Sequence, residues 1–192
     1  MKKLIGPDKT KTAVFISGTG SNLKKLIKFS YKKKSPISIK LVISNNKNAN
    51  GLKYANRKRI EKKIINFIKP KESEKKILTL LNERKIKFIC LAGFMKILSN
   101  KFIKKFNGKI VNIHPSLLPK YKGLNTHRKV IENNEKFSGC TVHYVTAQLD
   151  SGKIILQKQV KINKTDTEKT LKRKILKEEH KLYPKAIKKI FN

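Results

Sequence analysis

The chain has 192 residues, of which 48 are lysine or arginine and 12 are aspartate or glutamate, and its formal net charge is +36. This length favours one domain with a substantial core, and the sequence shows neither the roughly 20-residue apolar run of a membrane span nor the apolar region of a signal peptide, so a cytoplasmic protein is expected. The lysines are spread over nearly every segment, which favours a solvated basic surface over a specific nucleic-acid-binding protein.

Apolar strands alternate with helical patterns along the chain, which predicts an α/β domain with a mostly parallel sheet. A first strand is expected over 12–17, followed by a glycine turn and a helix with Leu23, Leu26 and Ile27 on one face. Further strands are expected over 37–43, 64–68, 87–91, 109–113, 140–145 and 153–162, and further helices over 50–60, 71–85 and 126–133.

The last predicted element is a long helix near the C-terminus. It is expected to begin with a capping box at Thr165 and Glu168 and to be interrupted at Pro184. No repeat or linker divides the sequence. Residues 1–192 are therefore expected to form a single domain, in which residues 1–11 are a short basic extension.

The cysteines and most histidines do not form a recognisable metal motif. Cys90 and Cys140 lie in apolar strand-like runs without a CxxC partner, so both are expected to be buried free thiols. His127, His143 and His180 are too far apart in sequence for a known ligand pattern, and no metal is expected.

The first candidate site is the turn SGTGSN, residues 17–22, between a strand and a helix. It is not a Walker loop, because no Gly-Lys-Ser/Thr follows, and Leu23 occupies the third glycine position of the dinucleotide fingerprint. What remains is a cradle for one phosphate group, in which Gly20, Ser21 and Asn22 supply the donors. A plain tight turn is the alternative.

The second candidate site combines the segment NIHPSLLP with a distant carboxylate. Asn112 and His114 stand one residue apart at the end of a strand, so both side chains point to the same side and can reach one carbonyl group. Asp150, in the loop LDSG, is expected to return to this edge, where it would raise the pKa of the imidazole and hold its orientation. For His114 alone, a satisfied core histidine is the alternative.

The sequence resembles the phosphoribosylglycinamide formyltransferases, the folate-dependent enzymes of de novo purine synthesis. The matching segments are ISGTGSNL, LAGFMKIL, NIHPSLLPKYKGLNTH and TVHYVTAQLDSGKIILQ. The resemblance implies a single-domain Rossmann-like formyltransferase fold with a mostly parallel sheet flanked by helices. It also implies transfer of a formyl group from 10-formyltetrahydrofolate to glycinamide ribonucleotide, without a metal.

The resemblance also assigns residues to roles. The implied catalytic residues are Asn112, His114 and Asp150. The implied ribonucleotide-binding residues are Gly20, Ser21 and Asn22 for the phosphate and Glu179 near the ribose. The implied folate-binding residues are Met95, Lys96, Ile97 and Leu98, together with Asn112. The alternative for Met95, Ile97 and Leu98 is the apolar core, and for Glu179 it is a solvated helix face.

Several positions depart from the family pattern. Asn125 stands where relatives often carry histidine, and Leu176 occupies a position that is usually polar, so that Lys177 or another nearby lysine would have to compensate. Lys96 replaces a common arginine and would hold the folate's glutamate tail as a point charge. An arginine expected before Leu91 is missing, and Lys69 or Lys71 could substitute for it.

The implied mechanism is direct attack of the ribonucleotide amine on the formyl carbon. Asn112 and a protonated His114 would stabilise the charge that develops on the formyl oxygen, and Asp150 would keep His114 cationic. The expected partners are the two small-molecule substrates. A homodimer is left open, and neither a membrane nor a specific nucleic acid is expected.

There are three alternative functions. Methionyl-tRNA formyltransferase has a similar core but continues into a C-terminal RNA-binding barrel, and formyltetrahydrofolate deformylase carries an N-terminal regulatory domain. Neither addition is expected within these residues. A basic nucleic-acid-binding protein without enzymatic activity would instead show tight, salt-sensitive binding to DNA or RNA and no folate-dependent turnover.

Overall fold

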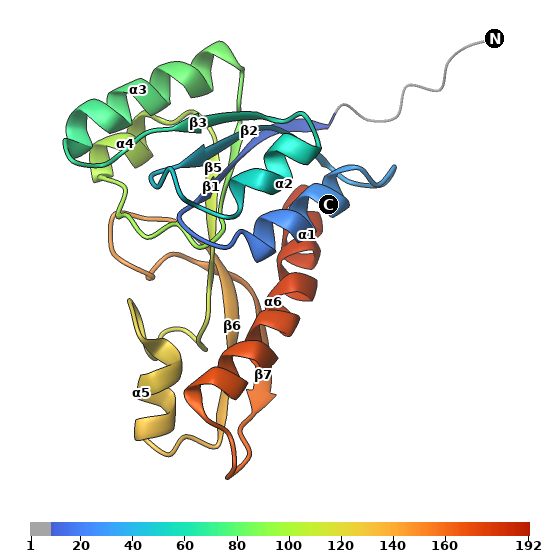
Figure 1. The fold of residues 1–192 in the computed structure, drawn as a ribbon, viewed down its shortest axis with the longest axis vertical. Helices are drawn as coiled ribbons and strands as arrows, with labels where there is room; N and C mark the ends of the chain where they lie inside the picture. Colours follow the sequence, from blue (N-terminus) through green and yellow to red (C-terminus); the bar gives the residue numbers. More distant parts are fainter. Residues whose placement is uncertain (1–8) are drawn as a thin grey trace. The chain divides into compact units, whose positions relative to one another are not determined.

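The computed structural model describes residues 9–192 (Figure 1), and along this range it contains seven strands and six helices. In chain order they are β1 (Thr10–Ile16), α1 (Ser21–Ser30), β2 (Ile37–Ser44), α2 (Leu52–Arg57), β3 (Glu61–Ile64), α3 (Pro70–Glu83), β4 (Phe88–Leu91), α4 (Asn100–Lys105), β5 (Lys109–His114), α5 (Thr126–Glu132), β6 (Phe137–Tyr144), β7 (Ile154–Lys161) and α6 (Glu168–Phe191).

Hydrogen bonds join the strands into one seven-stranded sheet in the order β3-β2-β1-β4-β5-β6-β7. The chain forms two compact units, of which unit 1 runs to Ile110 and includes Phe191 and Asn192, and unit 2 comprises Val111–Ile190. The expected extension over 1–11 lies mostly outside the described residues, and its last two residues already belong to β1. The α/β fold with a mostly parallel sheet is confirmed.

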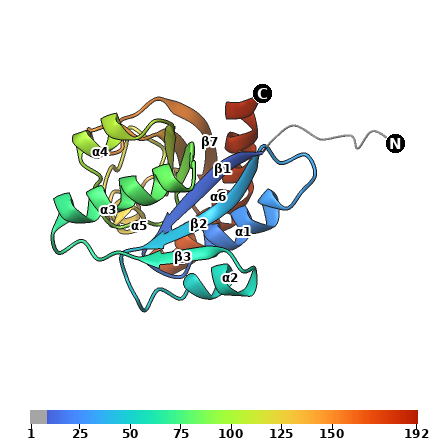
Figure 2. The same cartoon turned by 90° about the horizontal axis from the view of Figure 1, so that it is seen from above.

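Unit 1 is a parallel α/β layer structure. Strand β1 pairs in parallel with β2 and β4, and β2 pairs in parallel with β3. Helices α1 and α2 lie on one face of these strands and α3 and α4 on the other (Figure 2), as right-handed crossovers require. Because both faces are covered, the run Ala13–Ile16 is fully buried, although it does not alternate with polar residues.

Strand β3 corrects a sequence prediction. A strand was expected over 64–68, but β3 pairs with β2 through Glu61 opposite Leu41 and ends with Ile64 opposite Ser44. The apolar residues of the expected segment misled the prediction, because Ile64 and Ile68 are exposed. At the edge of the sheet, hydrogen bonding to β2 selects the strand, and a buried face is not needed.

Helix α4 was not predicted from the sequence. Its N-cap is Ser99, whose hydroxyl accepts a hydrogen bond from the Phe102 N–H at 3.1 Å. The Glu74 carboxylate of α3 accepts hydrogen bonds from the Ser99 N–H at 2.6 Å and from its hydroxyl at 2.5 Å. Only Phe102 of this helix is buried, so the sequence has no apolar stripe at helical spacing. The cap and the contact with α3 define the helix instead.

Unit 2 is built on antiparallel strands. β5 pairs with β6 and β6 with β7, and β6 and β7 form the expected hairpin. Helix α6 runs beside these strands (Figure 1), where the Tyr183 hydroxyl donates to the Val111 carbonyl at 3.1 Å and the Lys189 ammonium donates to the Ile155 carbonyl at 3.2 Å.

The predicted capping box at the start of α6 and the predicted interruption at Pro184 were both wrong. The helix begins at Glu168, and the reciprocal cap is formed by Thr167 and Thr170, each of which accepts a hydrogen bond from the other's N–H. The helix also continues through Pro184 to Phe191. The buried Tyr183 and the Lys189 contact with β7 hold the chain on both sides of the proline, so the lost backbone hydrogen bond does not end the helix.

Both cysteines are buried and neither forms a disulfide, as expected. Burial, followed by the charges of Glu179 and Glu178, raises the pKa of the Cys140 thiol to about 12. Cys140 is therefore an unreactive thiol.

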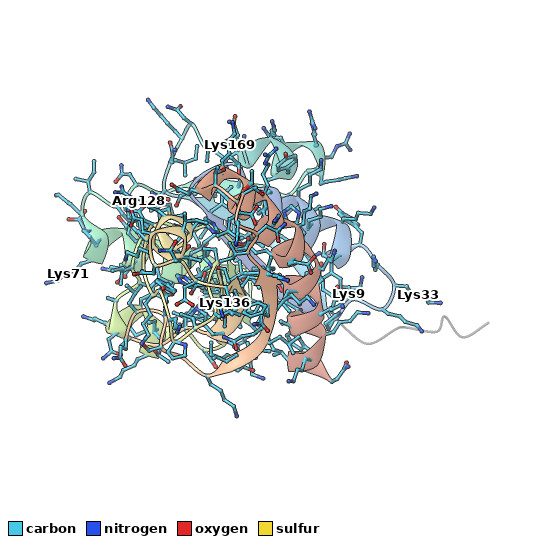
Figure 3. The ribbon with its side chains drawn as sticks, turned by 90° about the horizontal axis from the view of Figure 1, so that it is seen from below. Lys9, Lys33, Lys71, Arg128, Lys136 and Lys169 are labelled. Atoms are coloured by element: carbon cyan, nitrogen blue, oxygen red, sulfur yellow. The ribbon has the colours of Figure 1, made fainter. Side chains whose placement is uncertain are left out.

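The cationic side chains extend outward from many separate elements. Figure 3 labels six of them on different parts of the chain, among them Lys71 on α3, Arg128 on α5 and Lys169 on α6. These three residues are exposed. No helix of the described residues is long and apolar enough to cross a membrane.

The close approach of two glycines generates a prediction on stability. Gly20 has a left-handed backbone with φ of +70°, and a Cβ on Gly51 would lie 2.8 Å from the Gly20 Cα and 2.7 Å from the Ile16 Cδ1. We expect Gly51→Ala to lower the free energy of unfolding by about 1 to 3 kcal/mol, because the backbone cannot move aside freely. Urea denaturation measures this change.

Gly18→Ala is the matched control in the same turn region. A Cβ at Gly18 would meet nothing within 4 Å. The control should change the free energy of unfolding by less than about 0.5 kcal/mol. Equal effects of the two substitutions would contradict the packing argument.

Candidate active site

Two side chains of the candidate site come from β5. Asn112 and His114 alternate with buried Val111 and Ile113, so they lie on the same face of the strand. The side chain of His114 is buried, whereas Asn112 is partly accessible. The predicted juxtaposition of an amide donor and an imidazole is therefore present.

Asp150 comes from the turn between β6 and β7 and meets both residues. Its backbone is left-handed, with φ of +46°, and its side chain is buried. One carboxylate oxygen, Oδ2, lies 3.3 Å from the His114 Nδ1 and accepts the Gly123 N–H at 2.9 Å. The other, Oδ1, lies 3.5 Å from the Asn112 Nδ2. The structure thus brings together the three residues that the resemblance implied.

His143 is a member of this cluster that the sequence analysis missed. It stands opposite Asn112 in the antiparallel pair of β5 and β6, so the two side chains share one face. Its Nε2 lies 3.3 Å from the Asn112 Nδ2 and 3.6 Å from the Asp150 Oδ1, and its Nδ1 lies 2.9 Å from the Tyr144 carbonyl. The alternation within the strand indicates on which face His143 lies. Only the register between β5 and β6 identifies Asn112 as its neighbour.

The second ring nitrogen of His114 faces a backbone carbonyl. Nε2 lies 2.8 Å from the Tyr121 oxygen, and the Ser116 hydroxyl donates to the same oxygen at 3.2 Å. Both nitrogens of His114 therefore face acceptors, Tyr121 on one side and Asp150 on the other. A neutral imidazole has only one N–H, so this geometry favours uptake of a second proton.

Burial opposes that uptake. It lowers the pKa of His114 below its ordinary value of 6.5, outweighing the Tyr121 carbonyl and the Asp150 charge, which both raise it. The expectation that Asp150 keeps His114 cationic is therefore wrong for the unliganded protein. The Asp150 charge acts in the expected direction, but removing the imidazolium from water has the larger effect.

Asp150 itself stays ionised. Burial raises its pKa, but the hydrogen bond with His143, the Gly123 N–H and the charges of the two histidines together lower it below the ordinary value. At neutral pH the cluster therefore pairs a carboxylate with a largely neutral His114. It can accept a proton near the Asn112 amide, which is an arrangement suited to general acid–base chemistry.

The expected phosphate loop lies in unit 1. Gly20 caps α1 in the left-handed conformation, and Ser21 and Asn22 form the first turn of the helix. No side-chain hydrogen bond caps this end of α1, and a helix N-terminus is the kind of site that can bind an anion. Asn22 is buried rather than exposed at the loop surface.

The expected folate segment follows β4 in the same unit. The Met95 N–H donates to the Ser17 hydroxyl at 2.8 Å, which connects this segment to the start of the phosphate loop. Met95 and Ile97 are 63% and 69% exposed, so the core alternative does not hold for them, whereas Leu98 is buried. Lys96 is exposed.

The remaining expected residues lie apart from these groups in the sequence. Glu179 is buried in α6, which contradicts the alternative of a solvated helix face. Asn125 precedes α5 with a left-handed φ of +59° and makes no side-chain cap. No group of three or more histidine, cysteine, aspartate or glutamate side chains within residues 9–192 is arranged to hold a metal ion.

Comparisons with known proteins match nearly the whole chain. The model of the formyl transferase family matches residues 10–187. The chain is 41% identical over 181 residues to phosphoribosylglycinamide formyltransferase of Haemophilus influenzae, covering 93% of this chain and 85% of that protein. The crystal structure of phosphoribosylglycinamide formyltransferase from Brucella melitensis has a TM-score of 0.90 and 40% identity, covering 95% of this chain and 96% of that one.

A second group of relatives is much longer. The chain is 44% identical over 182 residues to the trifunctional purine biosynthetic protein adenosine-3 of Homo sapiens, covering 93% of this chain. The chain spans only 18% of that protein's length.

A half-buried histidine beside the site, His127, gives a prediction on stability. Burial, then the charges of Lys172 and His114, lowers the pKa of His127 to about 4, and its Nδ1 has no hydrogen-bond partner among the described residues. Below about pH 6.5 the unfolded chain binds a proton that the folded protein does not, so this contribution to stability is lost as pH falls toward 4.

We expect His127→Gln to reduce the difference in the free energy of unfolding between pH 7 and pH 4.5 by about 1 to 2 kcal/mol, because partial exposure of the ring to solvent weakens the effect. Urea denaturation of both proteins at the two pH values measures this, and the pH 7 values are the control for packing changes. The same pH dependence in both proteins would contradict a His127 that stays neutral in the folded protein.

Proposed function

Because this chain belongs to the formyl transferase family, we propose that it transfers a formyl group from 10-formyltetrahydrofolate to the amine of glycinamide ribonucleotide in de novo purine synthesis. The observation that carries this proposal is the cluster of Asn112, His114 and Asp150, with distances of 3.3 Å and 3.5 Å from the carboxylate to the imidazole and the amide. The cluster offers a donor and a proton carrier, and the reaction needs both.

The reaction forms one bond and breaks another. The amine nitrogen attacks the formyl carbon, negative charge develops on the formyl oxygen, and the bond from carbon to N10 of the folate then breaks. One proton must leave the attacking nitrogen and one must reach N10. The protein must therefore stabilise an oxyanion and move a proton, and it needs no covalent intermediate.

Asn112 donates its amide N–H to the oxyanion in this proposal. The pair of His114 and Asp150 carries one proton at rest and takes up a second from the attacking amine, because the developing negative charge raises the pKa of the imidazole. The pair then returns that proton to N10. A His114 that is largely neutral before the substrates bind is suited to this role, since it has a nitrogen free to accept.

The binding groups are proposed by residue. The N–H groups of Gly20, Ser21 and Asn22 would hold the ribonucleotide phosphate, and Glu179 would bind near the ribose. The exposed Met95 and Ile97 would contact the folate, with Lys96 as a point charge for its glutamate tail. The basic surface would raise the local concentration of both anionic substrates, and added salt should weaken this effect.

A spectrophotometric assay tests the reaction. Release of the deformylated folate is followed with and without glycinamide ribonucleotide, and we expect turnover only when the ribonucleotide is present. Equal turnover without it would identify a deformylase instead. No turnover with either mixture, together with tight DNA or RNA binding at physiological salt, would favour the non-enzymatic alternative.

The first catalytic prediction concerns the oxyanion donor. Asn112→Ala should lower kcat by about 10² to 10³ with little change in either KM, because the amide acts mainly on the charge that develops in the transition state. The control is Asn56→Ala, an exposed asparagine of α2, which should leave kcat within about twofold. A change in KM alone would assign Asn112 to binding.

The second catalytic prediction concerns pH. The acid limb of kcat/KM reports His114 in the free enzyme and should lie below pH 6.5. Asp150→Asn should move this limb to lower pH, because it removes a charge that raises the pKa of His114. The double variant of Asp150 and His114 should lose much less than the product of the single losses, since the pair acts as a unit. An unchanged acid limb in Asp150→Asn would show that Asp150 does not influence the pKa of His114.

A further inference from the structure

Tyr121 connects the active-site histidine to a residue that the reaction does not use. Its carbonyl lies 2.8 Å from the His114 Nε2, and its hydroxyl donates to the Glu135 carboxylate at 2.8 Å. Glu135 follows α5 and precedes β6. The two ends of one tyrosine thus contact His114 and Glu135.

The backbone of Tyr121 needs such support. Its φ is +56°, in the left-handed region that a bulky side chain adopts only when its surroundings hold it there. The Ser116 hydroxyl holds the backbone side, donating to the carbonyls of Lys120 at 2.7 Å and Tyr121 at 3.2 Å. On the side-chain side, Glu135 holds both the Tyr121 hydroxyl and, at 2.8 Å, the Lys120 ammonium.

We propose that Glu135 is a positioning residue for His114, which acts by holding the Tyr121 hydroxyl so that the Tyr121 carbonyl stays against Nε2. This inference rests on the proposed function only in so far as His114 carries the proton of the formyl transfer. Glu135 itself touches neither substrate nor reacting atoms.

The consequence is a choice of tautomer. The inference assigns the proton of neutral His114 to Nε2, because the Tyr121 carbonyl at 2.8 Å is the nearer acceptor, and the lone pair of Nδ1 then faces the Asp150 carboxylate, 3.3 Å away. This is the form that can take up a second proton between Nδ1 and Asp150. Without the carbonyl, the single proton would move to Nδ1, which would donate it to the Asp150 carboxylate. Nδ1 could then no longer accept a second proton.

Several titratable groups surround this ring and must be separated from the effect of Glu135. Asp150 faces it from the turn before β7, His143 from β6 and His127 from α5. Lys120 and Glu135 lie on the far side of Tyr121. Loss of the Tyr121 carbonyl contact removes an effect that raises the pKa of His114, so the pKa should fall further.

The experiment is a ¹⁵N NMR titration of the histidine rings without substrates, on the full chain and four variants. Glu135→Ala and Tyr121→Phe should both shift neutral His114 from the Nε2–H to the Nδ1–H tautomer and lower its pKa. Glu135→Gln keeps an oxygen that accepts the tyrosine O–H and should resemble the parent. Glu132→Ala removes an equal charge from α5, where Glu132 pairs with Arg128, and should also resemble the parent.

Activity provides the second readout. Glu135→Ala and Tyr121→Phe should each lower kcat by about 2- to 10-fold, as expected for one hydrogen bond, and the double variant should lose no more than either single variant. An unchanged tautomer and pKa in both single variants would overturn the inference. A Glu135→Gln or Glu132→Ala variant that behaves like Glu135→Ala would also overturn it, because charge alone would then be the cause.

The two proposals can fail separately. If the parent protein shows no ribonucleotide-dependent turnover, the proposed function fails, but the titration still decides whether Glu135 positions His114. If the parent is active and the titration is unchanged in Glu135→Ala, the positioning role fails and the proposed function stands.

Discussion

The active-site arrangement depends on a single buried carboxylate, that of Asp150. Its two oxygens face the Gly123 N–H, the His114 and His143 rings and the Asn112 amide, so one side chain connects a loop and two strands. A buried charge without such partners would cost several kcal/mol. Without the carboxylate, the Asn112 amide and the two imidazoles would lose the one group that they share.

The same burial that makes Asp150 effective also determines the state of His114. A carboxylate at 3.3 Å favours the imidazolium, yet the loss of hydration is the larger effect, and the pKa of His114 ends below its ordinary value. This outcome suits a group that must accept a proton during turnover. A permanently cationic His114 would be a donor only, and the amine's proton would then need another acceptor.

Much of the site could be predicted because it is encoded locally. Asn112 and His114 share a face through strand alternation alone, and Gly20 at the start of α1 follows from the glycine turn. Asp150 required the assumption that its loop returns to the same edge, which the resemblance supported. The implied roles of the ribonucleotide- and folate-binding residues stay predictions, as does the single domain.

The failures have a common physical origin. His143 joins the cluster because β6 pairs with β5 in one register, and α4 exists because Ser99 caps it and Glu74 holds the cap. β3 is an edge strand selected by backbone hydrogen bonds instead of an apolar face. In each case the decisive contact joins residues far apart in the sequence. Local periodicity carries no information about such contacts.

Several contacts between separate parts of the chain involve a carboxylate, although acidic residues are scarce. The chain has 12 acidic and 48 basic side chains, so most basic groups have no acidic partner. A carboxylate stabilises the fold most where it joins two separate parts of the chain. Within residues 9–192, five carboxylates do so, each through hydrogen bonds between separate elements or across a turn: Glu61 with Arg84, Glu74 with Ser99, Glu135 with Tyr121, Asp150 with Gly123 and Asp166 with Asn163.

Exposed lysines can vary with little effect on the fold, because each has water as an alternative partner. Removal of one of these five carboxylates has a larger effect, since donors on two parts of the chain then lose the partner that joins them. The large positive charge and the well-defined site are therefore compatible. The charge lies on the solvated surface, and the geometry of the site depends on a few anions placed where elements meet.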